Sequence, residues 1–542
     1  MLKVKTRNNS YIPGTEPWKN ILSDRKIKML DGSWAGVTRN HILSELPIRE
    51  ISKNYSKNMG RPSKELVTVT GACVLQQLFN LTDEETVEQL AFNEQWHYAL
   101  DSFNPEDQVV SLKTLWSVRY LLVMNKTANK LFNRVTDKLS VVYEVDTRLQ
   151  RLDSVHIFSN MAKLGRVRLL SRAVSIFIKN LKRHHKNLYE EVSLSELKIR
   201  YEKEESGAYF GAVKPSGTKK RIGEIALDMN LLINLFKGNE SVSGMYSYQM
   251  MQRVFNEHCK IEDDMVVVKK DKEVSSDSIQ NLSDVDAGYD GHKGQGYQVQ
   301  LMETYSRKDN DEDEERLNLV THVNVESADK HDSGAVEPAL NDLEERGMLP
   351  EECIADTAYG SESNRDLSEE YGTELISPVP GKKPEKDMSG FEFDNETYEI
   401  LKCPQGHQPI EHKQNRDSKT AIFSKEECKL CPHKLSCVIK NGKKGNLINY
   451  REKEAKSIIH RQYEQSEEFK DKYRYRSGIE ATNSRYIHMT GARRLRYRSL
   501  VRVNYSATLK ALGINIMRTA KFLRKRRKST FDFTEKQLKL AI

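Results

Sequence analysis

The chain has 542 residues, of which 30% are charged and 37% hydrophobic, and its formal net charge is +8. This length exceeds what one ordinary core supports, so roughly two to four domains are expected. No run of about eighteen apolar residues occurs, which excludes a membrane-spanning helix, and the N-terminus lacks the apolar core of a signal peptide. We therefore expect a cytoplasmic protein.

The N-terminal part reads as a polar segment followed by helices. Residues 1–40 are polar and mixed, which indicates an arm. Residues 41–145 have helical patterning, and the apolar stretch 66–79 predicts a buried helix. Thr82 and Glu85 form the capping box of the next helix. These features predict an all-helical domain over 41–145.

Basic residues on these helices suggest contact with DNA. Ser111 precedes a helical segment that carries Lys113 and Arg119. Several short helices with basic side chains suit a DNA reader of the helix-turn-helix kind. Lys113 and Arg119 are therefore candidate DNA contacts, and the alternative is a helical packing module that does not touch DNA.

The next part of the chain mixes strands and helices. Stretches rich in β-branched and aromatic residues predict four strands, at 152–159, 296–306, 317–327 and 352–356. A long helical stretch separates the first two, and residues 334–347 predict a helix before the fourth. Residues 454–487 then read as one long, charged helix.

Three carboxylates stand out against this pattern. Asp153 lies within the first strand, Asp356 ends the fourth, and Glu480 lies on the late helix. Phosphoryl transfer on DNA can use two divalent ions about 3.5–4 Å apart, and carboxylates must hold them. Asp153, Asp356 and Glu480 are therefore candidate catalytic residues and magnesium ligands.

Two further residues share a helix face with the last acid. Tyr473, Arg476 and Glu480 are three and four positions apart, so they stack on one side of a helix. The planar fork of Arg476 suits a phosphate, and Tyr473 suits a base or a phosphate. The alternative for Arg476 is a surface ion pair with Glu480.

The C-terminal part carries a basic segment without acids, from Arg493 to Lys528. A phosphate backbone is the natural partner of such a segment, and the alternative is a solvated basic tail. The candidate DNA contacts at its start are Arg493, Arg494, Arg496 and Arg498.

Four of the seven cysteines cluster at Cys403, Cys428, Cys431 and Cys437. In a reducing cytosol this spacing indicates a metal rather than disulfides. A CxxC pair with two distant thiols has the pattern of a tetrahedral, structural Zn²⁺ site, whose binding would fold a small module that lacks a core. Free, reduced cysteines are the alternative.

Together these motifs resemble the DDE class of bacterial insertion-sequence transposases. The resemblance is carried by the segments around Asp153 and Asp356, the strand at 296–306, and Tyr473, Arg476 and Glu480. It covers roughly residues 30–525. The lysine that completes the Tyr-Arg-Glu-Lys signature is replaced by Ile487, with Arg485 and His488 nearby, so Arg485 is a further candidate DNA contact.

The resemblance implies an α/β fold. Its catalytic domain is a ribonuclease-H-like mixed sheet with helices, interrupted by a helical insertion and a cysteine-rich insertion and preceded by the all-helical domain. The expected segments are an arm 1–40, a DNA-binding domain 41–145, a catalytic domain 146–375 with an insertion at about 164–280, a cysteine-rich insertion 376–450, a catalytic helix with basic helices 451–528, and a tail 529–542.

The implied activity is Mg²⁺-dependent cleavage at transposon ends, followed by joining of the freed 3′-hydroxyls to target DNA. Asp153, Asp356 and Glu480 would bind two Mg²⁺. The expected partners are double-stranded DNA, as terminal inverted repeats and target, and a second copy of the chain in the DNA complex. The protein would associate with the nucleoid when DNA is bound. The alternatives are a metal-dependent nuclease of the same fold and a non-catalytic DNA-binding derivative.

Overall fold

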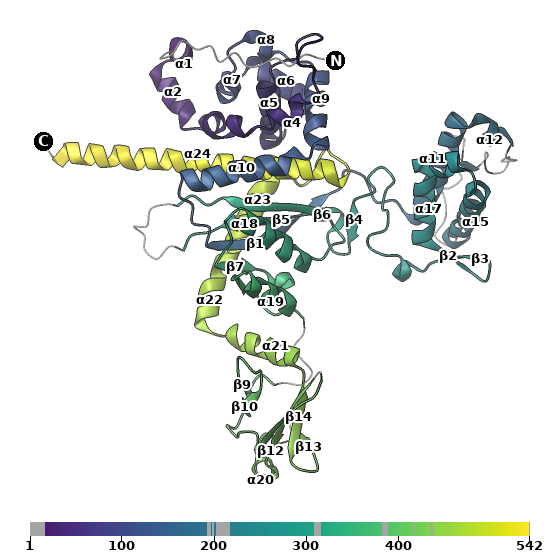
Figure 1. Ribbon diagram of the computed structural model, residues 1–542, viewed down its shortest axis with the longest axis vertical. Coiled ribbons are helices and arrows are strands. Elements are labelled where there is room, and N and C mark those ends of the chain that lie inside the picture. The colour runs from purple at the N-terminus through teal and green to yellow at the C-terminus, as the bar shows by residue number, and fades with distance from the viewer. Residues whose placement is uncertain are drawn as a thin grey trace.

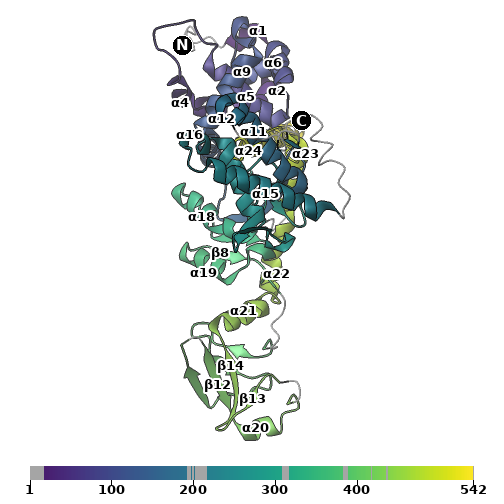
Figure 2. The same ribbon diagram turned by 90° about the vertical axis from the view of Figure 1, so that its right-hand side faces the viewer.

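A computed structural model gives the fold for most of the chain. It describes residues 17–191, 197, 200–201, 217–307, 316–381, 388–416, 418–434 and 437–540, with backbone alone for 191 and 527–540. A central sheet lies below the N-terminal helices, and two outlying modules project from it, one sideways and one downward (Figures 1 and 2).

The central sheet is mixed and has six strands. They are β1 (Leu149–Phe158), β4 (Gly288–Asp290), β5 (Gly294–Thr304), β6 (Val320–Ser327), β7 (Glu352–Ala355) and β8 (Glu374–Ile376). The order is β4-β5-β1-β7-β8, and β6 also pairs with β5. β1 runs antiparallel to β5 and parallel to β7, while β7 and β8 are parallel.

Helices cover both faces of this sheet, and the alternation of side chains along β1 explains why. Leu152 joins a core with α18 (Val336–Glu345), whereas Val155 and Ile157 join the core on the other face. Successive residues of a strand point to opposite faces, so a strand buried on both sides needs apolar residues at odd and even positions. α10 (Thr127–Val142) and α24 (Leu500–Leu540) contact β6 on the second face.

The N-terminal helices form one core with the C-terminal helix. The central helix is α5 (Leu66–Phe79), which is buried almost throughout and packs against α24. Figure 1 shows α24 running between these helices and the sheet. The other helices of this region are α1 (Pro17–Ile21), α2 (Asp24–Asp31), α3 (Trp34–Val37), α4 (Ile48–Ser52), α6 (Asp83–Phe92), α7 (Glu94–Leu100), α8 (Pro105–Gln108) and α9 (Leu112–Met124).

The structure differs here from the expected polar arm. Residues 17–37 form helices, and Trp18 and Trp34 are buried in the core they share with Phe79 and Tyr98. Two large aromatic rings anchor a segment whose average composition is polar. The first sixteen residues of that arm lie outside the described part of the chain.

A helical module (residues 164–285) lies between β1 and β4 and has its own hydrophobic core. Helix α11 packs against α15 and α17. The elements are α11 (Arg166–His184), α12 (Lys186–Glu191), α15 (Thr218–Phe236), α16 (Glu240–Ser243), α17 (Tyr246–His258) and the hairpin of β2 (Cys259–Glu262) and β3 (Met265–Val268). Because this core shares no residue with the sheet's cores, the module packs as a unit.

A cysteine-rich module (residues 388–450) lies at the far end of the molecule, below α21 (Figure 2). Its core of aromatic and aliphatic residues includes Phe391 and Tyr450 and extends to Ile458. The elements are β9 (Glu392–Phe393), β10 (Ile400–Lys402), β11 (Glu411–Gln414), β12 (Lys419–Phe423), α20 (Lys425–Lys429), β13 (Lys440–Asn441) and β14 (Asn446–Tyr450).

The predicted continuous helix over 454–487 is wrong in detail. The chain forms α21 (Glu452–Tyr463), α22 (Glu467–Tyr473), a 3-10 turn η7 (Arg474–Ser477) and α23 (Gly478–Thr490). Ser466 caps α22 by accepting a hydrogen bond from the Phe469 amide, so a new helix starts where one was expected to continue.

The mixed α/β class with a helical N-terminal region is confirmed, and the strand order and directions are consistent with the expected ribonuclease-H-like sheet. Among the described helices, none combines the length and apolar character that crossing a bilayer requires.

Candidate active site

Three carboxylates from three separate elements converge on one guanidinium. Arg476 lies 3.6 Å from Asp153, 3.8 Å from Asp356 and 2.5 Å from Glu480, measured between nitrogen and oxygen. The i,i+4 pair of Arg476 with Glu480 is therefore present, but Arg476 also joins the two aspartates to it. The structure thus brings together the three acids that the sequence singled out.

Strand pairing explains why the two aspartates are neighbours. β1 and β7 are parallel and pair Leu152 with Ala355, so the next residue on each strand carries an acid. Asp356 follows β7 and accepts a hydrogen bond from the Ala358 amide at 2.8 Å, which fixes its carboxylate. Glu480 reaches the same place from the first turn of α23, and its side chain is 61% exposed.

Asp153 is the most buried of the three, with 8% of its surface exposed. Burial raises the pKa of its carboxyl to about 6, although the Ser154 amide and Arg476 favour the charged form. Asp356 and Asp332 raise this pKa further because they bring like charge close to it. Several carboxylates therefore lie close together at this site, and the guanidinium of Arg476 partly neutralises their negative charge.

Two residues of this cluster escaped the sequence reading. Asn483 donates a hydrogen bond to Asp153 at 2.9 Å, and its position three residues after Glu480 on α23 was a usable signal. Asp332, in the turn after β6, contacts Gln300 at 3.0 Å and adds a fourth carboxylate near Asp153. Asp332 carried no such signal, because acids are common in that stretch of sequence.

The remaining signature residues have different surroundings. Tyr473, at the end of α22, stacks on Phe469. Burial raises the pKa of its hydroxyl, and Asp356 and Asp153 raise it further, whereas Arg476 lowers it. Arg485 instead lines a basic cavity of about 240 Å³ with Arg518 and Lys521. Ile487, which stands where the signature has lysine, is half-buried and packs against the core.

A fully buried carboxylate, Glu303 on β5, holds α23 and its preceding turn against the sheet. It accepts hydrogen bonds from Arg151 at 2.8 Å, Arg518 at 2.7 Å and Thr482 at 2.7 Å. Although burial alone raises the pKa of this carboxyl, the two guanidiniums lower it below its ordinary value. Arg151 also donates to the backbone oxygen of Tyr475 at 2.6 Å, next to Arg476. Glu303 therefore fixes the segment that carries Arg476 and Glu480.

The basic segment after α23 is partly exposed and partly structural. Arg493, Arg494, Arg496 and Arg498 are exposed. This basic loop (residues 493–498) continues the edge of β1, because the Phe158 amide donates to the Arg493 oxygen at 3.0 Å. Figure 1 shows that α24 then enters the body of the molecule.

Two cations of the basic segment are bonded within the protein, which corrects the expectation that the whole segment from Arg493 to Lys528 contacts phosphates. Lys510 is buried, and burial lowers the pKa of its ammonium to about 7, while Gln77 and Asn80 oxygens accept its hydrogen bonds. Arg518 pairs with Glu303. The side chains of Arg527 and Lys528 lie outside the described part of the chain.

The two candidate DNA contacts of the N-terminal helices differ. Lys113 is exposed on α9. Arg119 is held by an ion pair with Asp83 and lies over the Tyr497 ring, with 12% of its side chain exposed. Arg119 therefore ties α9 to α6 and to the basic loop. Because its guanidinium is bonded within the protein, it is not presented to a groove of DNA.

The four clustered cysteines lie in the cysteine-rich module as free thiols. Burial raises the pKa of the Cys437 thiol, and Cys431, Cys428 and Cys403 raise it further. Cys403 and Cys428 pack against the same core. Within the described residues, however, no three His, Cys, Asp or Glu side chains are arranged as a formed metal site. At Asp153, Asp356 and Glu480 the reason is Arg476, whose guanidinium pairs with all three carboxylates.

Replacing Glu303 with glutamine should destabilise the whole chain. The Glu303→Gln variant leaves two buried guanidiniums without a counter-charge, which costs about 3–5 kcal/mol. The urea midpoint of unfolding measures this loss. The matched control is Glu392→Gln, which removes an exposed pair with Lys402 and should cost less than about 1 kcal/mol. Equal midpoints for the two variants would contradict the role given to Glu303.

Comparison with known families supports the same interpretation from a different direction. Residues 402–520 match a family described as "Transposase DDE domain", and residues 38–121 match a second family described as "Transposase domain (DUF772)". No curated protein and no solved structure is significantly similar to the chain. The first match includes Glu480 and the basic loop, and the second covers the N-terminal region from α4 into α9. Both matches support the resemblance to the insertion-sequence transposases of the DDE class that the motifs predicted.

Proposed function

We propose that the protein binds the terminal repeats of its element, cleaves DNA at the ends and joins the freed 3′-hydroxyls to target DNA. The observation that supports this most is the convergence of Asp153, Asp356 and Glu480 on Arg476. The match of residues 402–520 to a transposase DDE domain supports DNA as the substrate class. DNA acts as both donor and target, and a second copy of the chain would take part in the complex at the nucleoid.

The carboxylate cluster fits divalent ions in the chemistry of its donors. Oxygen ligands from carboxylates suit Mg²⁺, which in phosphoryl-transfer sites is bound by a few carboxylates together with substrate phosphates. Asp153, Asp356 and Glu480 would hold the ions. When bound, two such ions activate the attacking oxygen and stabilise the leaving one.

The protein's own residues position the substrate around that chemistry. Arg476 would pair with a phosphate next to the scissile bond through its planar fork. Tyr473, at the same edge, donates to a phosphate or stacks on a base. Asn483 keeps the Asp153 carboxylate in place by donating to it. Positioning of this kind supplies much of the rate of phosphoryl transfer.

Two surfaces would hold the duplex. The exposed arginines of the basic loop suit phosphates, because they lie beside the end of β1 and form no ion pair among the described residues. The N-terminal helices, with Lys113 on an exposed face, would supply preference for the terminal repeat. Arg485 would contact DNA only if the duplex passes over the basic cavity behind α23.

Removing one acid at a time should stop cleavage but not DNA binding. Asp153→Asn, Asp356→Asn and Glu480→Gln each delete a ligand charge without changing shape. Mg²⁺-dependent nicking of DNA carrying the terminal repeats should fall below detection, while gel-shift affinity stays near that of the wild type. Glu362→Gln, an acid on α19 (Glu362–Glu370) that pairs with Lys456, is the control. Normal nicking by any one of the three would remove that residue from the site. Nicking without joining by the wild type would identify a nuclease instead.

Removing the guanidinium should strengthen metal binding in the absence of DNA. In Arg476→Gln the three acids lose their internal cation, so a divalent ion no longer competes with it. Titration calorimetry should show Mg²⁺ binding tighter by about tenfold, which corresponds to roughly 1.4 kcal/mol. Arg474→Gln, whose arginine pairs with Asp471 on the surface, should leave Mg²⁺ affinity unchanged. Equal or weaker binding by Arg476→Gln would show that Arg476 does not compete with metal.

We also propose that Cys403, Cys428, Cys431 and Cys437 bind one structural Zn²⁺. The CxxC spacing of Cys428 and Cys431 supports this, as does the packing of Cys403 and Cys428 against one core. Zn²⁺ binds thiolates, so loading would release their protons and draw the sulfurs into a tetrahedron. Four protein ligands leave no open position, and the ion would therefore serve folding.

Elemental analysis tests the zinc site directly. The wild type should purify with about one Zn²⁺ per chain, and a Cys428→Ser/Cys431→Ser variant with none. Cys259→Ala, which removes a buried thiol of the helical module, should retain the zinc. Equal zinc in the wild type and the double variant would rule out this assignment.

A further inference from the structure

We infer that one face of α11, in the helical module, is a third DNA-binding surface that contacts phosphates of the duplex held at the basic loop. The surface, called here the α11 stripe, consists of Arg168, Arg172, Lys179 and Arg183. This inference rests on the proposed function, because it extends the path of the same DNA beyond the sheet.

Helical geometry places the four cations in one line. At about 100° per residue, the four positions fall within an arc of about 60°. Their first and last members are about 22 Å apart along the axis, which matches roughly six base-pair steps of 3.4 Å. The opposite face, including Leu170, Phe177 and Leu181, is buried in the module's core. The stripe therefore cannot turn away from solvent without unpacking the module.

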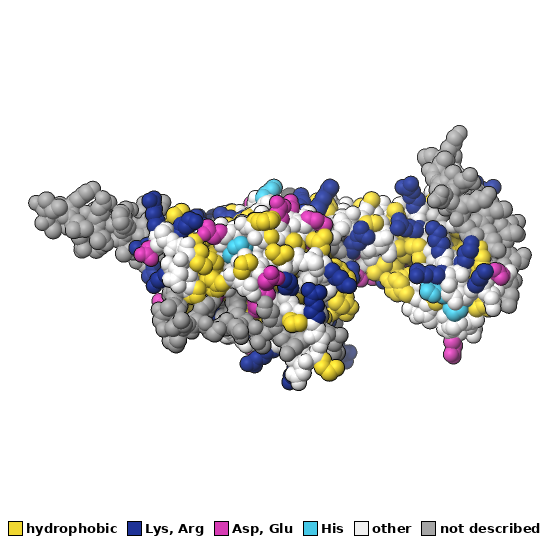
Figure 3. Space-filling view, turned by 90° about the horizontal axis from the view of Figure 1, so that it is seen from above, with side chains coloured by type: hydrophobic (Ala, Val, Ile, Leu, Met, Phe, Trp, Pro, Cys, Tyr) yellow, Lys and Arg dark blue, Asp and Glu magenta, His cyan; other side chains and the backbone are white. Residues whose placement is uncertain are grey.

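The positive charges of the α11 stripe are not neutralised by acids in the described part of the protein. All four side chains are exposed, and within the described part of the chain none of them forms an ion pair. Arg172 donates to the hydroxyl of Ser283 at 3.3 Å, and no other hydrogen bond of its side chain involves a described residue. α11 contains no acid at all, in contrast to α15 and α17 of the same module. Figure 3 shows Lys and Arg side chains gathered over this module.

The stripe is continuous with the basic loop. Arg498 donates to Asn160 at 3.0 Å, in the segment that leads from β1 to α11. Lys163, in the same segment, lies over the Tyr289 ring of β4, so another cation stands between the loop and α11. A duplex lying on the basic loop can therefore pass onto the α11 stripe without crossing an acidic surface formed by these residues.

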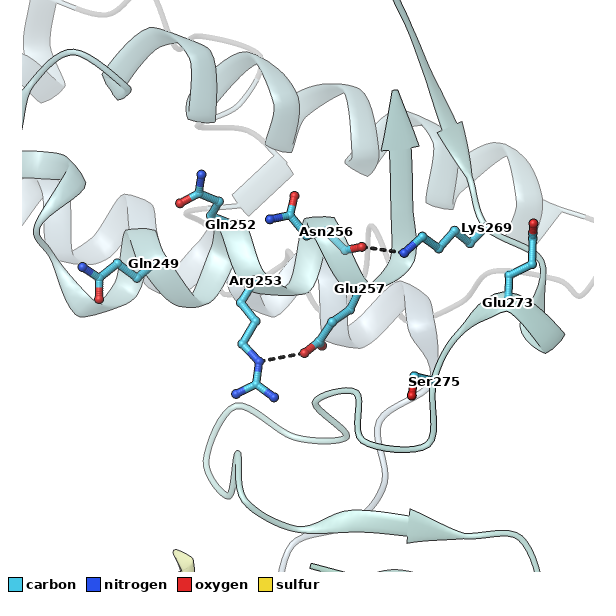
Figure 4. Close-up of a pocket in the computed structure, with 8 residues that line it drawn as sticks. All are labelled: Gln249, Gln252, Arg253, Asn256, Glu257, Lys269, Glu273 and Ser275. Carbon is cyan, nitrogen blue, oxygen red and sulfur yellow. Dashed lines mark hydrogen bonds and ion pairs between the residues drawn. The ribbon is translucent and has the colours of Figure 1, made fainter. Parts of the chain in front are cut away.

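A second polar surface of the module has different chemistry. A cavity of about 430 Å³ beside α17 is lined by Gln249, Gln252, Arg253, Asn256, Glu257, Lys269, Glu273 and Ser275 (Figure 4). Its charges are balanced, since Arg253 pairs with Glu257 and Lys269 donates to the Asn256 oxygen. This cavity lacks the unpaired positive charge that a phosphate backbone requires. Of the two surfaces, the α11 stripe is therefore the better candidate for contact with DNA.

Contacts of this kind are measured by salt dependence. Each phosphate that a cation neutralises releases counterions, and the slope of log affinity against log salt falls by about 0.9 per contact for duplex DNA. The α11 stripe should therefore contribute a slope of about 3–4 without any base preference. It should also protect about six base pairs from hydroxyl radicals.

The test compares two variants of the full chain on a random-sequence duplex of about 50 bp. The first is Arg168→Gln/Arg172→Gln/Lys179→Gln/Arg183→Gln. The control removes four exposed lysines of the same module, Lys219→Gln/Lys220→Gln/Lys237→Gln/Lys272→Gln. The stripe variant should lose at least about tenfold in affinity near 0.1 M salt, lower the slope by about 3–4 and shorten the footprint at one end. Thermal melting shows whether each variant is folded, and Lys179→Gln/Arg183→Gln, with half the expected effect, replaces a variant that is not.

Each outcome decides something specific. A stripe variant that equals the control in slope and footprint overturns the inference, and the proposed function stands if neutralising the basic loop still weakens binding. A wild type that does not bind the duplex contradicts the proposed function itself. Loss of binding to single-stranded RNA or to anionic vesicles, with duplex binding unchanged, would assign the stripe to another partner and overturn the inference.

Discussion

The structure depends on a carboxylate that has no contact with solvent. Glu303 joins β5 to β1 through Arg151, to α24 through Arg518 and to α23 through Thr482. Placing three charges in a protein interior is costly, and apolar residues of equal volume would often be as stable. The cluster instead fixes the positions of the elements that it joins, because each planar guanidinium donates its hydrogen bonds in a fixed geometry. The 3-10 turn before α23 is fixed in the same way, by the hydrogen bond from Arg151 to Tyr475.

The segment that Glu303 fixes carries Arg476 and Glu480, and it therefore sets the balance of charge at the carboxylate cluster. Asp153, Asp356 and Glu480 repel one another, and Arg476 offsets that repulsion. The planar fork of this guanidinium is also suited to a phosphate, so the acids and a phosphate would compete for it. An arginine stays charged with either partner.

Sequence patterns predicted the parts of this arrangement that depend on local chemistry. Strand content and the acids at Asp153 and Asp356 followed from residue type and position, and the capping box at Thr82 is present in the structure. The patterns could not identify Glu303, because an acid within an apolar strand is read as a surface residue until its partners are known. The reverse error affected cations: Arg119, Lys510 and Arg518 were counted as basic surface, yet each is bonded inside the protein. The predicted arm failed for the same reason, since two tryptophans outweigh a polar average.

Exposure therefore divides the positive charge of this chain into two groups with different functions. The buried cations pair with Glu303, Asp83 or backbone oxygens and hold α23, the N-terminal helices and α24 together. The exposed cations of the basic loop and of the α11 stripe form no ion pair with an acid among the described residues. A net charge of +8 understates this surface, since acids elsewhere offset it in the sum but not in space. The helical module has its own core, so its basic face can be altered without disturbing the site that Glu303 positions.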